Sequence, residues 1–320
     1  MKTRAAFATF TAATLAGCHS APPTNDAVRR SGPPVIAYGG LVLTYDPDID
    51  RVTSIIPPEG TNLLHTANLD QEPSPTGDYT FYGGAYTWTA PQAGAWGWRD
   101  AAGGEKAWPP DPAMDIGPAT IRSRTQTHVT VTNPPALNGL VQFKRFAIID
   151  RETIHVTFAL KNTSDHPVAA GAWVNTAVAP DSVIAVRRGA GTPIRGWDDT
   201  AIERFNSIST PPGPHGWSLV RIPAANWEGG GKIWLDTKPE IAIWRDGWWL
   251  LRRQPSIDTE NRLKAMGEGA VAVYIQPDAG IVEAELYAPI TDIEPGATRT
   301  DVEIWHLIRD PAGTVDALPK

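Results

Sequence analysis

Apolar and polar residues alternate along most of the chain, which is the pattern of strands with one buried face. The alternation is clearest over Leu41 to Tyr45, Arg51 to Ile56, Thr127 to Val131, Leu140 to Ile149 and Thr153 to Lys161. The 320 residues include 29 Gly and 30 Pro, which leaves little room for long helices. The pattern predicts at least ten strands and one short helix, over Ser256 to Ala265.

One hairpin can be specified in register. An Asp-Gly pair at 246–247 is a favoured two-residue turn, and it would place Trp244 opposite Trp249 and Glu240 opposite Arg253. This register puts two indoles on one face of the hairpin, with a cross-strand ion pair beyond them.

The carboxy-terminal part follows the same plan. A second hairpin is expected between 270–276 and 281–287, and a last strand over 301–308. Strands without helices between them pair antiparallel, because parallel strands need long crossover connections. We therefore predict an all-β fold, a large antiparallel β-supersandwich that forms a single domain over residues 35–320.

The amino terminus has the features of a bacterial lipoprotein signal. Lys2 and Arg4 precede a small-residue apolar stretch that closes with Leu15-Ala16-Gly17-Cys18. We predict a signal peptide over 1–17, followed by a lipidated and flexible tether over 18–34, with the only cysteine as the acylated residue. The alternative is a chance apolar run that ends at a structural free thiol.

The negative net charge of the chain argues against some classes of binding partner. The formal net charge is −7, and removal of residues 1–17 would leave 26 of the 28 Lys and Arg against 35 Asp and Glu, a net charge of −9. An acidic chain is a poor ligand for nucleic acid or anionic lipid. Attachment to a lipid bilayer would depend on acyl chains at Cys18. The residue after that cysteine is His19 and not an acidic residue. By resemblance to lipoprotein sorting in Gram-negative bacteria, this predicts a protein of the cell envelope that is anchored in the outer membrane and faces the periplasm. No protein partner is predicted.

Aromatic residues gather between 79 and 112, among many glycines and prolines, so this stretch is expected to be mostly loop. Indoles on loops can offer a flat apolar face to a sugar ring, and nearby polar groups can bind its hydroxyls. The candidate ligand-binding residues are Trp88, Gln92, Trp96, Trp98, Trp108 and Asp111. The alternative is that these tryptophans cover an open end of the core.

Several short motifs carry a family resemblance. They are Asn62-Leu63-Leu64-His65, the stretch from Tyr82 to Gln92, Trp108-Pro109-Pro110-Asp111, the stretch from Leu160 to Asp165 and the stretch from Glu285 to Ile290. Together they resemble a family of uncharacterised bacterial envelope lipoproteins, similar in fold to the galactose mutarotase (aldose 1-epimerase) superfamily, over about residues 36–308. The resemblance implies a β-supersandwich with a concave, sugar-sized face.

The same resemblance exposes a difference. Mutarotases use a histidine acid and a glutamate base on that face, but Trp173 stands here where the histidine would fall. His128 and His215 are the available replacement proton donors, or they are structural. The segment from Lys264 to Gly267 resembles a Lys-x-x-Gly signature of the family, which implies that Lys264 contacts a ligand. The alternative is that Lys264 is a surface lysine.

Glu283 and Glu285 share one face of a predicted strand with Tyr287, and the two carboxylates are about 7 Å apart at the backbone. Paired carboxylates can divide acid and base roles, although a solvated outer face would give the same pattern. The acidic turn at 46–50 imitates the start of a calcium loop but lacks the required Gly and Glu, which favours a polar turn. We predict no metal and no cofactor.

The leading hypothesis is therefore a lipid-anchored envelope protein that binds a carbohydrate or polyol without mutarotase activity. A carbohydrate-active enzyme with a different acid and base is the first alternative. A structural envelope protein is the second.

Overall fold

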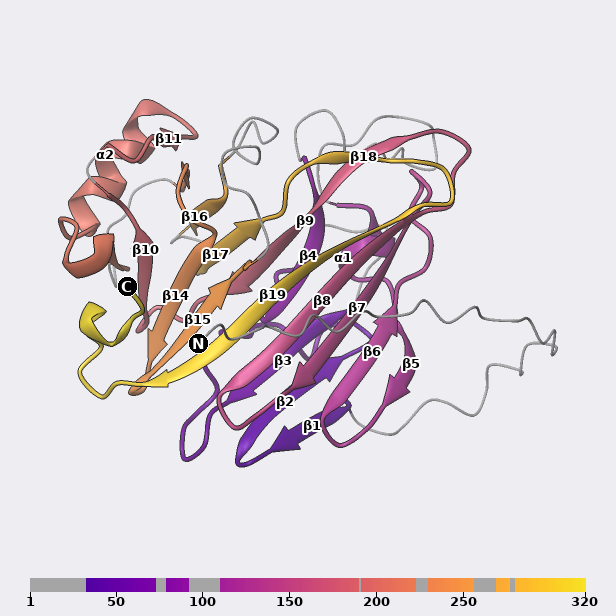
Figure 1. Cartoon of the computed structure of the whole chain (residues 1–320), viewed down its shortest axis with the longest axis horizontal. Helices are drawn as coiled ribbons and strands as arrows, with labels where there is room; N and C mark the ends of the chain where they lie inside the picture. Colours follow the sequence, from indigo (N-terminus) through magenta and orange to yellow (C-terminus); the bar gives the residue numbers. More distant parts are fainter. Residues whose placement is uncertain are drawn as a thin grey trace, which may run out of the picture. The chain divides into compact units, whose positions relative to one another are not determined.

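Two antiparallel sheets make up the described part of the chain, as the computed structural model shows (Figure 1). The ten-stranded sheet contains, in spatial order, β1 (Val35–Tyr38), β2 (Leu41–Asp46), β3 (Arg51–Ile56), β4 (Ala85–Ala90), β9 (Val168–Ala177), β17 (Ile281–Tyr287), β16 (Val271–Gln276), β13 (Gly231–Leu235) and β11 (Ile194–Gly196), with β18 (Thr291–Ile293) paired to β9. The described residues are 33–72, 79–91, 110–189, 191–222, 230–255, 269–276 and 280–320.

The nine-stranded sheet crosses the view of Figure 1 from β10 to β5. Its strands are, in spatial order, β12 (Trp217–Arg221), β10 (Val183–Arg187), β14 (Glu240–Arg245), β15 (Trp248–Arg253), β19 (Thr298–Arg309), β8 (Thr153–Asn162), β7 (Leu140–Ile148), β6 (His128–Thr132) and β5 (Thr120–Arg124). Residues Pro33–Lys320 form one compact unit. The predicted antiparallel β-supersandwich is confirmed.

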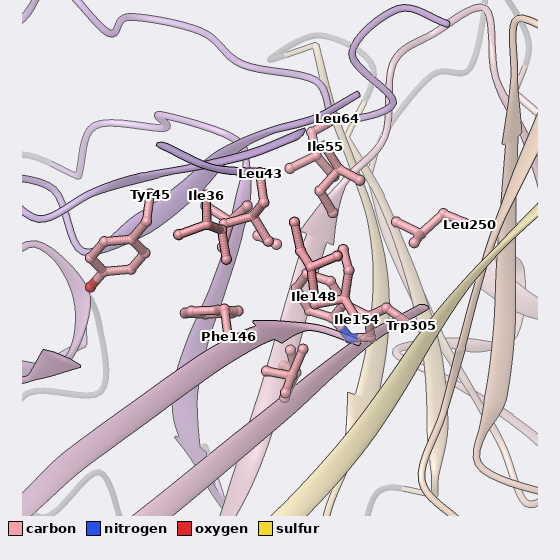
Figure 2. Packing of buried hydrophobic residues seen from close by; sticks show 14 of the residues in the cluster. Ile36, Leu43, Tyr45, Ile55, Leu64, Phe146, Ile148, Ile154, Leu250 and Trp305 are labelled. Carbon is pink, nitrogen blue, oxygen red and sulfur yellow. The ribbon is translucent and has the colours of Figure 1, made fainter. Parts of the chain in front are cut away.

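The core lies between the two sheets and follows directly from the alternation. Along β8, Ile154, Val156 and Phe158 are buried, while the residues between them are only half-buried. These side chains pack with residues of β1 to β3, and Figure 2 shows Ile36 and Leu43 with Ile154 in this cluster. β8 therefore contributes every second side chain to the interior, because successive side chains point to opposite faces.

The Asp-Gly hairpin has the expected register. Trp244 pairs with Trp249 and Glu240 with Arg253, on the adjacent strands β14 and β15. The expected ion pair within the hairpin is wrong, because the Glu240 carboxylate instead binds the Arg187 guanidinium at 2.8 Å. Arg187 comes from β10, which lies on the other side of β14, so strand order decided the partner.

The helices differ from the expectation. The structure has α1 (Pro112–Asp115) and α2 (Asp199–Ile208), while the expected helix over 256–265 lies outside the described residues. The described residues also form two 3₁₀ turns, Pro214–Gly216 and Val315–Ala317. Asp198 caps α2 by accepting a hydrogen bond from the Ala201 amide at 2.7 Å, and Ala201 and Phe205 bury one face of the helix. No described helix has the length and apolarity to cross a membrane.

Candidate functional site

The central strands of the ten-stranded sheet are buried on both faces. Along β9, Ala172 and Val174 face the core between the sheets, so Trp173 and Asn175 point to the opposite side, here called the outer face. All four side chains are buried. An antiparallel sheet with one solvated face would leave the second pair exposed, so this outer face is not an ordinary surface.

Strand register brings the side chains of the outer face into three rows. The first row holds Tyr86, Asn175, Glu285, Ala272 and Trp234. The second row holds Trp88, Trp173 and Tyr287. The third row holds Glu283, Tyr274 and Lys232. The ten residues of these rows other than Ala272 are called the outer-face cluster below.

Glu285 lies at the centre of the cluster and is fully buried. Its Oε2 atom accepts hydrogen bonds from the Trp173 indole at 2.9 Å and the Tyr287 hydroxyl at 2.7 Å. The same oxygen lies 2.7 Å from the Lys232 ammonium, which also lies 4.2 Å from the centroid of the Trp173 ring. Three donors therefore converge on one carboxylate oxygen.

Glu283 lies two residues before Glu285, on the same face of β17, and accepts a hydrogen bond from the Tyr86 hydroxyl. Burial raises the pKa of Glu283 to about 7, and the charge of Glu285 adds to the shift. Burial and the neighbouring Glu283 also raise the pKa of Tyr86 well above its ordinary value. The two glutamates therefore differ in environment, and Glu283 is the one placed to exchange a proton near neutral pH.

A buried ion pair holds the aromatic side of the cluster in place. The Arg51 guanidinium lies 2.7 Å from Asp115 and 4.0 Å from the centroid of the Tyr86 ring. Asp115 also accepts a hydrogen bond from the Trp88 indole at 2.8 Å. Arg51 therefore fixes Tyr86, and through it Glu283, without belonging to the cluster itself.

Local backbone geometry brings β4 to its place in the sheet. Gly83 and Gly84 precede the strand with φ of 70° and 76°. A Cβ atom at these positions would lie 2.3 Å from the His65 carbonyl oxygen and 2.4 Å from that of Val52, respectively. The Gly-Gly motif is thus required for the close approach of backbones that positions Tyr86 and Trp88.

Several polar atoms of the cluster are buried without a hydrogen-bond partner in the part of the chain that the structure describes. They are both side-chain amide atoms of Asn175, Oε1 of Glu285 and the indole nitrogen of Trp234. Asn175 and Glu285 are direct cross-strand partners. Since such atoms are costly to bury unpaired, their presence side by side suits a site that completes its hydrogen bonds with a ligand.

The structure brings together three of the sequence-predicted residues, Trp88, Glu283 and Glu285. The expectation that Trp88 lies on a loop is wrong, because residues Ala85–Ala90 form β4 and the Trp88 side chain is 2 % exposed. Five other candidates, together with the lipidation site, lie outside the described residues: Gln92, Trp96, Trp98, Trp108, Lys264 and Cys18.

The remaining candidates lie apart from the cluster. Asp111 caps α1, and its two carboxylate oxygens accept hydrogen bonds from the backbone amides of Ala113 and Leu137. His128 lies on β6, in the other sheet, with its ring 2.8 Å from the Thr125 hydroxyl. His215 is exposed in the turn before β12. Neither histidine contacts the two glutamates among the interactions of the described residues.

The acidic turn at 46–50 is not simply solvated. Asp50 is buried and binds the Lys144 ammonium and the Tyr45 hydroxyl. Among the described residues, no group of three or more His, Cys, Asp or Glu side chains is arranged to hold a metal ion.

Sequence reasoning missed Asn175, Lys232 and Trp234 as members of the site. Lys232 and Trp234 alternate with Ile233 and Leu235 on β13, so their shared face was readable from the sequence. Their burial and their contact with Glu285 were not, because a lysine on a solvated strand gives the same alternation.

The raised pKa of Glu283 predicts a pH dependence of stability. Between its ordinary value of 4.5 and about 7, the folded chain retains a proton that the unfolded chain has released, so stability should fall as the pH rises through this window. Glu283→Gln cannot ionise and should lose this component. Urea unfolding at pH 5 to 8 measures it: the midpoint of the variant should gain on wild type with rising pH. Parallel curves would contradict the assignment.

Comparison with solved structures confirms the galactose mutarotase-like fold. The chain is similar to a candidate aldose 1-epimerase from Escherichia coli K12, with a TM-score of 0.56 and 11 % identity over 86 % of this chain and 98 % of that one. It is also similar to galactose mutarotase-like proteins from Lactobacillus casei (TM-score 0.53, 9 % identity, 86 % and 100 % covered) and Clostridium acetobutylicum (TM-score 0.52, 11 % identity, 86 % and 94 % covered).

Sequence comparison gives a family and no named function. No curated protein matches the chain. A family model matches residues 41–308, which include every described member of the outer-face cluster. The chain therefore belongs to the family described as Domain of unknown function (DUF4380).

Proposed function

We propose that the outer-face cluster binds a carbohydrate or a related polyol. The observation that carries the proposal is the pair of unpartnered groups, the Asn175 amide and Oε1 of Glu285, on directly opposed strand positions. An amide supplies both a donor and an acceptor and a carboxylate supplies an acceptor, which matches hydroxyl groups that donate and accept at once. Neighbouring hydroxyls on one sugar ring would satisfy both residues.

The aromatic rows support the same ligand class. Trp173 and Tyr287 stack with ring centroids 5.2 Å apart, and Trp88 meets Trp173 edge-on at 5.0 Å. Flat apolar rings beside polar groups suit a ligand that has C–H and hydroxyl faces together. The mutarotase-like fold of the three structures above agrees with a sugar ligand.

Asn175→Leu gives a direct test. Leucine has a similar volume and removes a buried amide with no partner, so stability should stay unchanged or rise by about 1 kcal/mol. Saccharide binding should fall about tenfold, which corresponds to about 1.4 kcal/mol, since one lost hydrogen bond costs about 1–3 kcal/mol when its partner stays buried. Urea unfolding and calorimetric titration with galactose, glucose and their oligosaccharides measure the two effects.

Asn162→Leu is the matched control. Asn162 is equally buried, but its amide donates to the carbonyls of His166 and Ile293, at 2.7 and 2.8 Å. This variant should lose stability and, once folded, keep its saccharide affinity. A loss of stability in Asn175→Leu as large as in Asn162→Leu would assign Asn175 to the fold and remove the main support for the binding site.

A second candidate function is catalysis on a carbohydrate. It is favoured by the two glutamates, since Glu283 has a pKa of about 7 while Glu285 is bound to Lys232. Such a pair can divide acid and base roles without the histidine that mutarotases use. Polarimetry of freshly dissolved sugar anomers with wild type and Glu283→Gln decides the matter, because only an enzyme loses turnover in the variant.

The proposal includes a lipid anchor at Cys18, which would hold the sugar-binding domain at the cell envelope, on the outer membrane facing the periplasm. Its support is the lipobox-like sequence at 15–18. Metabolic labelling with a palmitate analogue, compared between wild type and Cys18→Ser, tests the anchor independently of the sugar site.

A further inference from the structure

An exposed tryptophan borders the outer-face cluster. Trp197 is 64 % exposed, far more than the other aromatic residues near it. It directly follows β11, and its backbone amide donates to the Lys232 carbonyl at 2.8 Å, so it extends the sheet beside β13. Its ring lies 6.0 Å from that of Tyr274, centroid to centroid, at an angle of 49°.

Tyr274 connects this tryptophan to the two glutamates. It is the cross-strand partner of Glu283 on one side and of Lys232 on the other. Burial raises the pKa of Tyr274 to about 12, and the charges of Glu283 and Glu285 add to the shift. Tyr274 therefore lies within electrostatic reach of the centre of the cluster, while its ring contacts Trp197 at the edge.

The distance between the two places exceeds a single sugar ring. In the strand order β17, β16, β13 and β11, three strand spacings separate the backbone of Glu285 from that of Trp197. At the usual strand spacing this is about 14 Å. A ligand that contacts both Asn175 and Trp197 must consist of more than one ring.

We propose that Trp197 and Tyr274 form an aromatic subsite for a second or third sugar residue, so that the ligand is an oligosaccharide or the end of a glycan chain. The inference rests on the proposed function. An exposed indole gains by covering its face, and sugar rings offer C–H faces of matching size. The surroundings favour this ligand over a protein partner. Large apolar patches mark protein interfaces, whereas charged residues, the ion pair of Arg195 and Asp236, lie beside this tryptophan.

The test measures affinity against chain length. Wild type, Trp197→Ala and Trp197→Phe are titrated calorimetrically with galactose and glucose and with their β-1,4-linked oligosaccharides of two to four residues. Wild type should bind the tri- and tetrasaccharide about tenfold more tightly than the monosaccharide, because one more ring is covered. Trp197→Ala should lose this gain and keep the monosaccharide affinity. Trp197→Phe should retain most of it.

Tyr38→Ala is the matched control, since Tyr38 is 52 % exposed at the opposite edge of the same sheet and should not affect binding. Monosaccharide binding without a gain for longer chains would overturn the subsite and leave the proposed function intact. So would an equal loss for all chain lengths in Trp197→Ala. Absence of binding for every saccharide would overturn both the proposed function and the subsite.

Discussion

Arg252→Met is expected to lower the free energy of unfolding by about 3–5 kcal/mol, because it leaves Glu303 buried without its counter-charge. The guanidinium binds the Glu303 carboxylate at 2.9 and 3.1 Å and is fully buried between the sheets. It also donates to Oγ1 of Thr176 and the carbonyl of Ala284, at 2.6 and 3.0 Å. Equilibrium unfolding in urea measures the loss.

Two further variants define what the measurement means. Arg151→Met breaks the exposed pair with Glu152 and should change stability by less than about 0.5 kcal/mol. The double change Arg252→Met with Glu303→Leu removes both buried charges and should recover most of the loss. If the double variant is as unstable as the single one, the hydrogen bonds to Thr176 and Ala284, and not the ion pair, hold the sheets together.

Glu285→Gln is expected to have the largest effect on binding. The change takes from Lys232 the carboxylate that lies 2.7 Å from its buried ammonium and leaves a neutral amide there, and it should cost about 3–5 kcal/mol of stability. Saccharide affinity should fall about 30- to 100-fold, because hydrogen bonds to a charged acceptor are roughly twice as strong as neutral ones. Urea unfolding and calorimetric titration give the two values.

The double change Lys232→Met with Glu285→Gln separates stability from binding. Its stability should exceed that of Glu285→Gln alone, since no unpaired charge remains, and a double-mutant cycle gives the coupling energy. Saccharide binding should not return. Recovery of both would show that the loss of affinity in the single variant came from partial unfolding and not from the missing carboxylate.

The buried ion pairs Arg252–Glu303 and Lys232–Glu285 act on opposite sides of the same strands. Arg252 binds Thr176 of β9 and Ala284 of β17 from the core side. Their chain neighbours Asn175 and Glu285 point to the outer face. Arg252 therefore supports the two strands that carry Asn175 and Glu285. The placement of these proposed binding groups thus depends on the same contacts that stabilise the fold.

Parts of this arrangement could be predicted because they depend on local geometry. Alternation gave the strands, the Asp-Gly turn gave the register of Trp244 with Trp249, and a period of two placed Glu283 and Glu285 on one face. The helix α2 could also have been found, since Asp198 is a favourable cap ahead of Ala201 and Phe205. Each of these features involves residues close together in the sequence.

Burial and partnership could not be predicted in the same way. Lys232 and Glu285 lie 2.7 Å apart, but β16 separates their strands, and nothing near either residue indicates the other. Residues 85–90 look like part of a loop because glycines and prolines surround them, yet pairing with β9 makes them a buried strand. Long-range pairing overrode local composition at this position.

By itself, the sequence determined the class of fold, the facing of side chains along each strand and the turns that set local register, because these follow from the two-residue period of an extended backbone. Only the tertiary structure decided that the outer face is buried, which charges meet there and that Asn175 lies opposite Glu285. A buried charged strand and a solvated one have the same alternation, and the difference arises from strand order and from what packs against them.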